Sequence, residues 1–287
     1  MKLLNVGCGR RFHPDWTNID LVASSPEVRE YDLRKGLPFP DGSFDAVYHS
    51  HVLEHLDPTS AEEMLRECVR VLKPEGVLRI VVPDLEGIAR EYLRTLESAA
   101  SDRDNPAAVF SHQWMTRELL DQMCRQKLGG EMGQLMRTSH EAEQAYIYSR
   151  IGQELGGNGS VGRKTIWRRV KQLTLSLRKR IALTAVSVIE GSSGRMAYRE
   201  ARFRQSGEIH RWMYDRVSLT QLVQCLGLES ARVCSASESK IPGFSSYGLD
   251  SDSNGARKPD SLFFESVKST AACRQTNFPQ SNLRSAA

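Results

Sequence analysis

The chain begins Met1-Lys2-Leu3-Leu4-Asn5-Val6-Gly7-Cys8-Gly9, a short apolar run that ends in two glycines separated by one residue. Such a run is typical of a strand that is covered on both faces of a parallel sheet. Glycines in the following turn let the main chain approach a ligand closely, and ligands of open α/β sheets lie beyond the carboxyl ends of the strands. Gly7 and Gly9 therefore indicate a cofactor-binding turn, although a tight turn without a ligand explains the two glycines alone equally well.

The pattern that follows indicates an α/β fold. Apolar runs at 17–21, 44–50 and 76–82 predict three more strands. Between the last two runs, Ser60 as N-cap and Glu63 in a capping box predict the start of an amphipathic helix. Strands that alternate with helices favour a doubly wound, mostly parallel sheet.

The chain divides into four predicted parts. Residues 1–84 form the first half of the α/β domain, and 85–206 are too long for a simple crossover, which predicts a helical insertion or cap with helices at 85–99, 116–128 and 141–155. The second half of the domain spans 207–268, with a helix that Ser218 caps and Gly227 ends, and with strands at 231–236 and 261–268. The polar, aperiodic tail 269–287 predicts disorder.

Composition excludes several classes of protein. The six cysteines of the 287 residues are scattered and include no C-x-x-C pair, which argues against a disulfide scaffold and a zinc ribbon. The first residues lack the apolar core of a signal peptide, and no stretch approaches the length of a membrane span. This pattern is typical of a reduced, cytoplasmic protein.

Positive charge is concentrated in one segment. Residues 163–189 contain eight Lys or Arg and no acid, so the rest of the chain carries −4 of the net charge of +4. Apolar residues recur there at helical spacing, at Ile166, Val170, Leu173, Leu177 and Ile181. Three interpretations stay open: a lid or homodimer helix with a solvated face, a peripheral contact with the inner face of a membrane, and a nucleic-acid contact.

Further residues support a nucleoside-type ligand. Asp20 closes the predicted strand at 17–21, where a carboxylate can accept hydrogen bonds from both hydroxyls of a ribose. Asp32 and Leu33 precede Leu37-Pro38-Phe39-Pro40-Asp41-Gly42-Ser43-Phe44-Asp45, where a polar group can meet an adenine amine and Leu33 can pack on the ring. A solvated loop carboxylate is the alternative for Asp32.

Four segments together resemble a known family. Asn5–Gly9, residues 37–45, His51-Val52-Leu53-Glu54-His55-Leu56 and Arg70–Gly76 resemble the class I S-adenosylmethionine (SAM)-dependent methyltransferases, and among them the type 11 subgroup. The resemblance covers residues 1–84 well and 207–268 loosely. It implies a seven-stranded, Rossmann-like sheet with its last strand antiparallel, and SAM as the cofactor.

The resemblance also implies roles for single residues. The turn formed by Gly7, Cys8 and Gly9 would lie against the methionine part of SAM. Asp20 would hold the ribose, Asp32 and Leu33 the adenine, and residues 49–51, beginning with His49, would face the sulfonium.

The chain departs from the family pattern after the glycines. Only Arg10–Trp16 separate the turn from the second strand, which is too short for a full crossover helix. We expect Arg10 or Arg11 to supply positive charge for the SAM carboxylate, with solvent-facing arginines as the alternative. A dinucleotide cofactor is disfavoured, because Phe12 stands at the third glycine position and Asp20 comes too early.

The string His51-x-x-Glu54-His55 admits two metal interpretations. It matches an inverted zinc-protease motif, but that motif requires a long helix and this string follows a strand. By resemblance, some ubiquinone-pathway and small-RNA methyltransferases carry a metal triad here, with which His51, Glu54 and His55 align. A site with two histidines and one carboxylate would favour a transition metal over Mg²⁺. Our prediction is no metal, with this triad as the alternative.

If the chain is a methyltransferase, a histidine is the expected general base that takes the proton from the methyl acceptor. His51, His55 and His210 are the candidates for activating a hydroxyl or an amine, and a structural role is the alternative for each. We expect transfer to an oxygen of a small molecule or a glycan. The alternatives are a non-catalytic SAM-binding partner or sensor protein and an RNA methyltransferase. The absence of interleaved aromatic and basic residues outside one segment disfavours nucleic acid.

Overall fold

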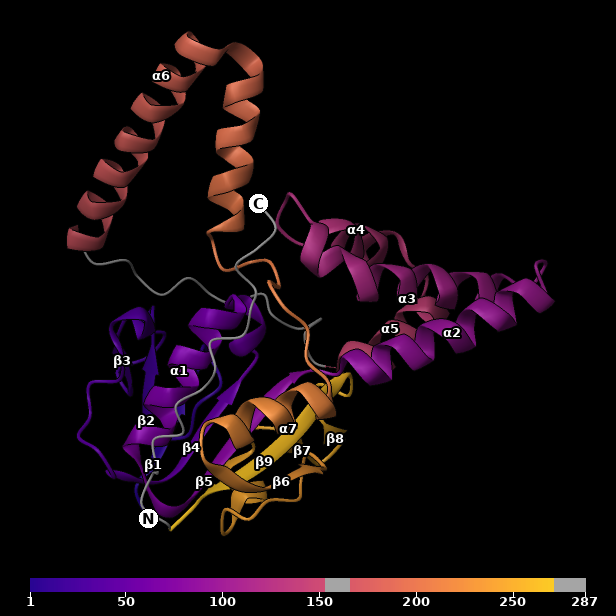
Figure 1. Cartoon of the computed structure of the whole chain (residues 1–287). Coiled ribbons are helices and arrows are strands. Elements are labelled where there is room, and N and C mark those ends of the chain that lie inside the picture. Colours follow the sequence, from indigo (N-terminus) through magenta and orange to yellow (C-terminus); the bar gives the residue numbers. More distant parts are fainter. Residues whose placement is uncertain (153–165, 271–287) are drawn as a thin grey trace, which may run out of the picture.

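The computed structural model describes residues 1–152 and 166–270, and only the backbone for residues 166–179. A seven-stranded sheet runs through it in the order β3-β2-β1-β4-β5-β9-β6 (Figure 1). The strands are β1 (Leu3–Val6), β2 (Thr17–Asp20), β3 (Val28–Glu30), β4 (Phe44–Ser50), β5 (Leu72–Pro83), β6 (Leu228–Cys234) and β9 (Ser261–Lys268). The first five are parallel, and β9 is antiparallel to both of its neighbours. The predicted fold class is therefore confirmed, including the antiparallel last strand.

The link between β1 and β2 is shorter than a crossover helix, as the sequence indicated. Leu4, Asn5 and Val6 pair in parallel with Thr17, Asn18 and Ile19. Turns and loop, without a helix, join the two strands. The buried amide of Asn18 helps to fix this loop, because its Nδ2 donates to the carbonyl oxygens of His13 and Trp16 at 3.0 and 2.8 Å.

The N-caps of two helices differ from the sequence predictions. Helix α1 (Pro58–Val71) is capped by Asp57, whose carboxylate accepts from the Ser60 amide, so Ser60 is not the N-cap. Proline is well suited to the first helical position after such a cap, which moves the start toward the N-terminus. Helix α7 (Arg216–Cys225) is capped by Asp215, whose Oδ1 accepts from the amides of Val217 and Ser218, so Ser218 lies inside the capping box and is not the N-cap.

The two faces of the sheet are covered differently. One face packs on α1 and α7 through a large apolar cluster that includes Val47, Leu65, Ile80 and Val223. The other face is covered by Trp16 and by the segment leading through the short helix η4 (Phe244–Tyr247). A two-stranded ribbon of β7 (Ser251–Asp252) and β8 (Gly255–Ala256) lies beyond that helix. The core of the domain is thus the sheet itself, with its carboxyl edge left for the site.

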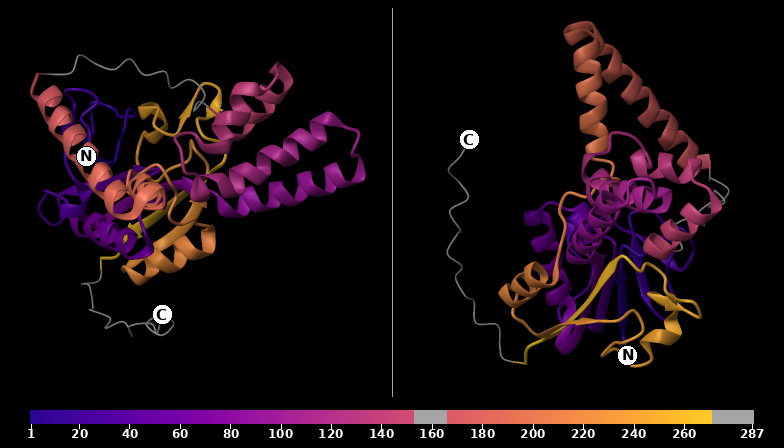
Figure 2. Two further views of the ribbon diagram at one scale, coloured as in Figure 1. Left: turned by 90° about the horizontal axis from the view of Figure 1, so that it is seen from above. Right: turned by 90° about the vertical axis from the view of Figure 1, so that its right-hand side faces the viewer.

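The segment after β5 forms a separate helical layer that projects from the sheet (Figures 1 and 2). It contains α2 (Leu85–Ser101), α3 (Pro106–Cys124), α4 (Gly130–Thr138) and α5 (Glu141–Ile151). These helices share a small core around Ile88, Trp114 and Ile147. Helix α3 begins earlier than the predicted 116–128 because Asn105 caps it and Pro106 occupies its first turn.

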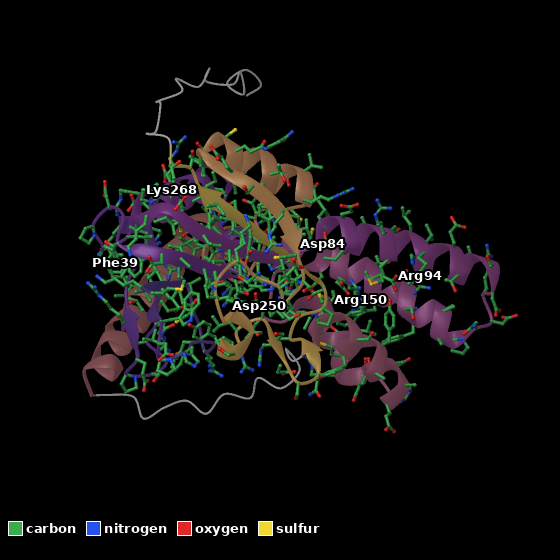
Figure 3. All side chains as sticks on the ribbon, turned by 90° about the horizontal axis from the view of Figure 1, so that it is seen from below. Phe39, Asp84, Arg94, Arg150, Asp250 and Lys268 are labelled. Carbon is green, nitrogen blue, oxygen red and sulfur yellow. The ribbon has the colours of Figure 1, made fainter. Side chains whose placement is uncertain are left out.

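The connection between this layer and the sheet is tight. Asp84 forms an isolated parallel bridge with Tyr214, so the chain leaves and re-enters the sheet domain at one place. Arg150 pairs with the buried Glu118 at 2.6 Å, and its carbonyl oxygen accepts from the Asp260 amide. Figure 3 shows Asp84 and Arg150 near this junction, with Arg94 far out along α2.

Helix α6 (Ile166–Arg204) is bent at Gly191, whose φ is 67°. The prediction of an apolar stripe and a basic face at 163–189 falls largely on side chains outside the described residues. The predicted break at 156–160 and most of the tail also lie outside them. Among the described helices, none combines the length and the apolarity that crossing a membrane requires.

Candidate functional site

The glycine turn lies at the carboxyl end of β1 and is held against β2. The amides of Gly7 and Cys8 both donate to the carbonyl oxygen of Ile19, at 2.9 and 3.2 Å. Gly7 and Gly9 have φ values of 66° and 55°, a region that side chains rarely adopt. The backbone therefore requires glycine at both positions.

The two glycines differ in what surrounds them. A Cβ atom on Gly7 would lie 2.5 Å from Cγ2 of Val52, whereas a Cβ atom on Gly9 would meet nothing within 4 Å. Val52 follows His51 directly, so the glycine turn touches the turn that carries the histidines. Open space over Gly9 is what a ligand lying against the main chain requires.

Asp20 braces the glycine turn. Its Oδ2 accepts from the Gly9 amide at 2.8 Å, and its Oδ1 accepts from the Val22 amide at 3.0 Å. Each carboxylate oxygen can accept a second hydrogen bond. Asp20 thus fixes the turn and keeps acceptor capacity for ribose hydroxyls at the end of β2.

The residues expected at the adenine are positioned by β3, a strand that the sequence analysis missed. Asp32 follows β3 and caps the short helix η1 (Leu33–Lys35), while Leu33 packs against the edge of the main core. Both Asp32 oxygens contact Arg34 at 2.8 Å, and this hydrogen bonding lowers the pKa of Asp32 to about 2. Arg34 therefore competes for the carboxylate that was expected to meet an adenine amine.

The other expected cofactor residues in the turn have different surroundings. Arg10 and Arg11 are both exposed, with the Arg11 amide donating to the Cys8 carbonyl oxygen at 2.9 Å. Cys8 is buried, and burial raises the pKa of its thiol to about 12. Its side chain therefore stays a neutral thiol at physiological pH.

A second turn, at the end of β4, carries the histidines. His51 has a φ of 54°, which is strained for a residue with a side chain. Its amide donates to the Val81 carbonyl oxygen at 2.9 Å, its Nδ1 lies 3.0 Å from Oε1 of Glu54, and its Nε2 lies 3.0 Å from Oγ of Ser261. Both ring nitrogens of His51 are therefore engaged within the protein.

Glu54 and His55 lie on the short helix η2 (Leu53–His55), and His210 comes from the other half of the chain. The amide of Arg211 donates to the Glu54 carbonyl oxygen at 2.7 Å, which fixes the His210 segment on this helix. The His55 and His210 rings meet edge to face with centroids 4.9 Å apart. The structure thus brings the three candidate bases, His51, His55 and His210, together around Glu54.

The electrostatics of this cluster follow from its burial. Glu54 is fully buried, and His210 is 5% exposed. Burial alone would raise the pKa of Glu54, but the hydrogen bond from His51 and the nearby histidines hold it below its usual range. Burial lowers the pKa of His210 to about 3, so its imidazole is neutral at physiological pH. The cluster contains a buried anion among imidazoles.

A cavity of about 280 Å³ opens beside the cluster. His51, Glu54, His55 and His210 line it together with the charged residues Arg125, Glu208, Lys258 and Asp260. These four charged residues could not be grouped from the sequence, because most of them are far apart along the chain. The cavity can take a small polar group beside the histidines.

His49 lies on β4, two residues before His51, and its surroundings differ from those of the other histidines. Its side chain is fully buried, and neither ring nitrogen has a hydrogen-bond partner among the described residues. Burial lowers the pKa of His49 to about 4. The structure therefore gives His49 no exposed atom with which to face a sulfonium.

The low pKa of His49 predicts a loss of stability in acid. The unfolded chain binds a proton below pH about 6.5, whereas folded His49 stays neutral until about pH 4. The free energy of unfolding should therefore fall as the pH decreases, by about 2 kcal/mol between pH 7 and 5 from His49 alone. In His49→Phe this part of the decline should disappear. Denaturant titrations in the presence of a chelator, at both pH values, measure it.

Phe44→Leu is the matched control, because it perturbs the packing of the same strand without removing a titratable group. Its free energy of unfolding should be lower than that of the wild-type chain by the same amount at both pH values. Equal pH slopes for His49→Phe and the wild-type chain would show that His49 is not held neutral.

Comparison with known proteins supports the expected family. Residues 14–80 match the family model described as a methyltransferase domain. The match covers Asp20, Asp32 and the whole His51–His55 turn. The match confirms the sequence resemblance of this part of the chain to a methyltransferase domain.

Solved structures with partial similarity include the [4+2]-cyclase SpnF, with 28% identity over 28% of this chain and 38% of that chain, and a TM-score of 0.24. The YcgJ protein from Bacillus subtilis has 22% identity over 33% of this chain and 51% of that one, with a TM-score of 0.25. A SAM-dependent methyltransferase from Archaeoglobus fulgidus has 12% identity over 93% of this chain and 86% of that one, with a TM-score of 0.37. The chain thus spans about half or less of the length of the first two proteins.

Proposed function

We propose that this chain is a SAM-dependent methyltransferase that transfers the methyl group to an oxygen of a small molecule or a glycan. The observation that carries the proposal is the contact between two turns. Gly7, in the turn that would receive SAM, packs on Val52, in the turn that carries the histidines. A methyl donor on one turn and an acceptor on the other would therefore be neighbours.

The residues of the first turn fit the cofactor. The space over Gly9 would accept the methionine part of SAM, with Arg10 or Arg11 near its carboxylate and Cys8 beneath the main chain. Asp20 would hold the ribose hydroxyls, and Leu33 would pack on the adenine, with Asp32 beside it. When bound, SAM supplies an electrophilic methyl group on a sulfonium.

The chain's own contribution to methyl transfer is alignment and proton handling. An in-line displacement requires the acceptor oxygen to be held close to the methyl group with water excluded. The buried walls around Glu54 and His210 would exclude water from the cavity. Of the three candidate histidines, His55 and His210 would orient the acceptor hydroxyl and assist the loss of its proton, while His51 would hold Glu54 in place.

Other features of the chain limit the choice of partner. Carboxylates and cations on the cavity wall, including Glu208 and Lys258, suit a polar acceptor that carries several hydroxyl groups. We further propose that residues 163–189 serve as a homodimer or lid helix or as a peripheral membrane contact, and supply no catalytic residue. A cytoplasmic location is consistent with these proposals.

Gly9→Ala tests the cofactor site. A methyl group at this position would protrude into the space assigned to SAM, so SAM affinity should fall at least tenfold. The left-handed backbone should cost about 1–2 kcal/mol of stability, which denaturant unfolding measures separately. Isothermal titration calorimetry with SAM and S-adenosylhomocysteine gives the affinities.

Gly227→Ala is the matched control. Gly227 also has a positive φ, 78°, with nothing within 4 Å of a Cβ atom, but it lies between α7 and β6, away from the glycine turn. It should lose similar stability and keep the wild-type affinity for SAM. Equal affinities for SAM in both variants would contradict the placement of the cofactor. Formation of S-adenosylhomocysteine from SAM in the presence of a pool of hydroxylated metabolites then tests catalysis.

A further inference from the structure

Three side chains near the cavity offer metal-ligand atoms to one another. One atom each from Glu54, His55 and His210 lie within 4.8 Å of one another. Ligand atoms about 2 Å from a common ion are separated by no more than about 4 Å, so small side-chain rotations would bring these three into a coordination sphere. The set differs from the one expected by sequence resemblance, because His210 takes the place of His51.

The buried atoms of this set lack other partners. Oε2 of Glu54 and Nδ1 of His210 have no hydrogen-bond partner among the described residues. Leaving a buried carboxylate oxygen and an imidazole nitrogen unpaired costs several kcal/mol in a protein interior. A cation between them would compensate both atoms at once.

His55 already has the arrangement of a metal-binding histidine. Its Nδ1 lies 3.1 Å from the carbonyl oxygen of Ile209, a contact that is favourable when Nδ1 carries the proton. That tautomer leaves the lone pair of Nε2 available. Histidines that bind metals commonly donate the other ring N–H to a backbone carbonyl or a carboxylate in this way.

His51 supports the set without joining it. Its ring bridges Oε1 of Glu54 and Oγ of Ser261. This bridge fixes the orientation of the carboxylate and uses both ring nitrogens. His51 is therefore a positioning residue for Glu54.

We propose that Glu54, His55 and His210 bind a divalent transition-metal ion, of which Zn²⁺ is the representative. Two imidazole nitrogens and one carboxylate oxygen are the donor set of catalytic zinc and non-haem iron sites, whereas Mg²⁺ and Ca²⁺ prefer oxygen ligands. Three carboxylates, Glu54, Glu208 and Asp260, line the cavity with the cations Arg125 and Lys258. Arg125 is paired with Asp121 at 3.1 Å, which reduces its repulsion of an ion.

The role of the ion rests on the proposed function. An ion held by Glu54, His55 and His210 would have three protein ligands, which leaves capacity for an acceptor hydroxyl from the cavity. The ion would supply Lewis-acid chemistry that lowers the pKa of such a hydroxyl, which is the contribution that methyl transfer to oxygen needs. His55 and His210 then act on the acceptor through the ion.

The test is metal binding by the full-length chain without a histidine tag. After dialysis against a chelator, the wild-type protein should bind one equivalent of Zn²⁺ by calorimetry and by elemental analysis. Mg²⁺ should not compete. Co²⁺ should give visible absorption bands that indicate imidazole coordination. A folded wild-type chain with no saturable Zn²⁺ site would overturn the proposal.

Variants assign the ligands. His55→Gln and His210→Gln should each weaken Zn²⁺ binding at least 100-fold, and His51→Gln about tenfold, as expected for a positioning residue. His140→Asn, which removes an exposed imidazole and keeps a good N-cap for α5, should leave binding unchanged. A larger loss in His51→Gln than in His210→Gln would favour the other set and refute this one.

SAM titrations on the same preparations separate this proposal from the proposed function. Zn²⁺ binding without SAM binding would leave the metal site standing and remove the methyltransferase proposal. SAM binding without Zn²⁺ binding would leave the methyltransferase proposal standing and remove the metal site.

Discussion

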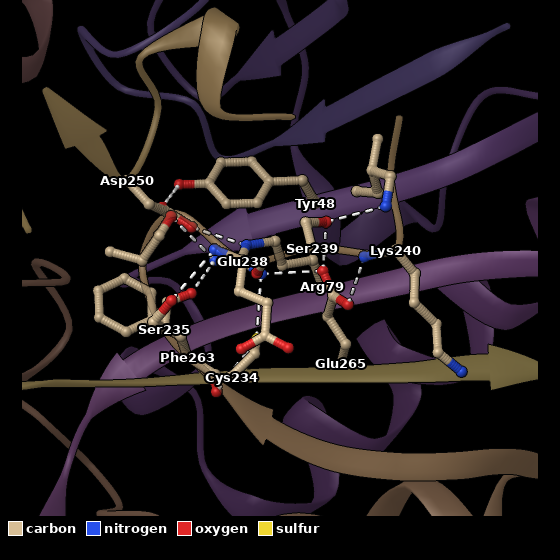
Figure 4. Close-up of polar contacts among 12 residues, drawn as sticks. Tyr48, Arg79, Cys234, Ser235, Glu238, Ser239, Lys240, Asp250, Phe263 and Glu265 are labelled. Atoms are coloured by element: carbon tan, nitrogen blue, oxygen red, sulfur yellow. Dashed lines mark hydrogen bonds and ion pairs between the residues drawn. The ribbon is translucent and has the colours of Figure 1, made fainter. Parts of the chain in front are cut away.

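Replacing Arg79 with methionine is expected to lower the free energy of unfolding by about 3–5 kcal/mol. Arg79 lies on β5 and is fully buried, with Nε 2.7 Å from Oδ2 of Asp250 and Nη1 2.8 Å from Oε1 of Glu265 (Figure 4). Both carboxylates are buried as well. Removal of the guanidinium would leave the buried Asp250 without a cation and the buried Glu265 with Arg232 alone.

The remaining contacts would not compensate for this loss. Asp250 would keep the hydrogen bond from the Tyr48 hydroxyl at 2.5 Å. Glu265 would keep the hydrogen bonds from Arg232, Ser239 and the Lys240 amide. Burial already raises the pKa of Asp250, so we expect this acid to take up a proton in the variant. Urea denaturation monitored by circular dichroism measures the loss.

Arg66→Met is the matched control. Arg66 forms an exposed pair with Glu62 one helical turn away on α1, and such pairs contribute about 0.5 kcal/mol or less. A triple variant, Arg79→Met with Asp250→Asn and Glu265→Gln, should recover part of the stability because no buried charge remains. A loss in Arg79→Met as small as in Arg66→Met would mean that the network is hydrated.

This network illustrates what the sequence could not indicate. Arg79 is the one charged residue of the apolar run at 76–82, and its partners lie 171 and 186 positions further along the chain. Charge pairs of this separation depend on which segments become neighbours in space, here β5 with β9 for Glu265 and β5 with the segment before β7 for Asp250. Local patterns contain no information about that choice.

Much of the sheet was predictable, because buried parallel strands are continuous apolar runs. The strands at 44–50 and 261–268 were predicted with the observed bounds. The strand at 28–30 was missed because it has three residues, of which only Val28 is buried. The start of α1 was misplaced because Asp57 followed by Pro58 is a better cap than Ser60.

Part of the candidate site was likewise predictable from the sequence, and part was not. The glycine turn and Asp20 were found because they are local to β1 and β2. The grouping of His210 with Glu54 required the Arg211 amide to dock on η2, more than 150 positions earlier in the chain. The metal triad that the resemblance implied as an alternative therefore contained His51 and not His210.

Asp20→Ala is expected to reduce SAM affinity about 100-fold. A carboxylate that accepts hydrogen bonds from a ribose contributes about 1.5–3 kcal/mol, which is 10- to 100-fold in affinity. The same substitution also releases the Gly9 amide, which Asp20 holds at 2.8 Å. Calorimetry with S-adenosylhomocysteine measures the sum of both effects, so a second ligand is needed to separate them.

The 2′-deoxy analogue of S-adenosylhomocysteine provides that separation as one side of a double-mutant cycle. If Asp20 holds the ribose, the wild-type chain should prefer the natural ligand at least tenfold, and Asp20→Ala should bind both ligands with similar, low affinity. If Asp20 only braces the turn, the preference for the natural ligand should be the same in both proteins. That second outcome would leave the glycine turn as a binding site but would remove the sugar contact from it, and with it the reason for an acid at the end of β2.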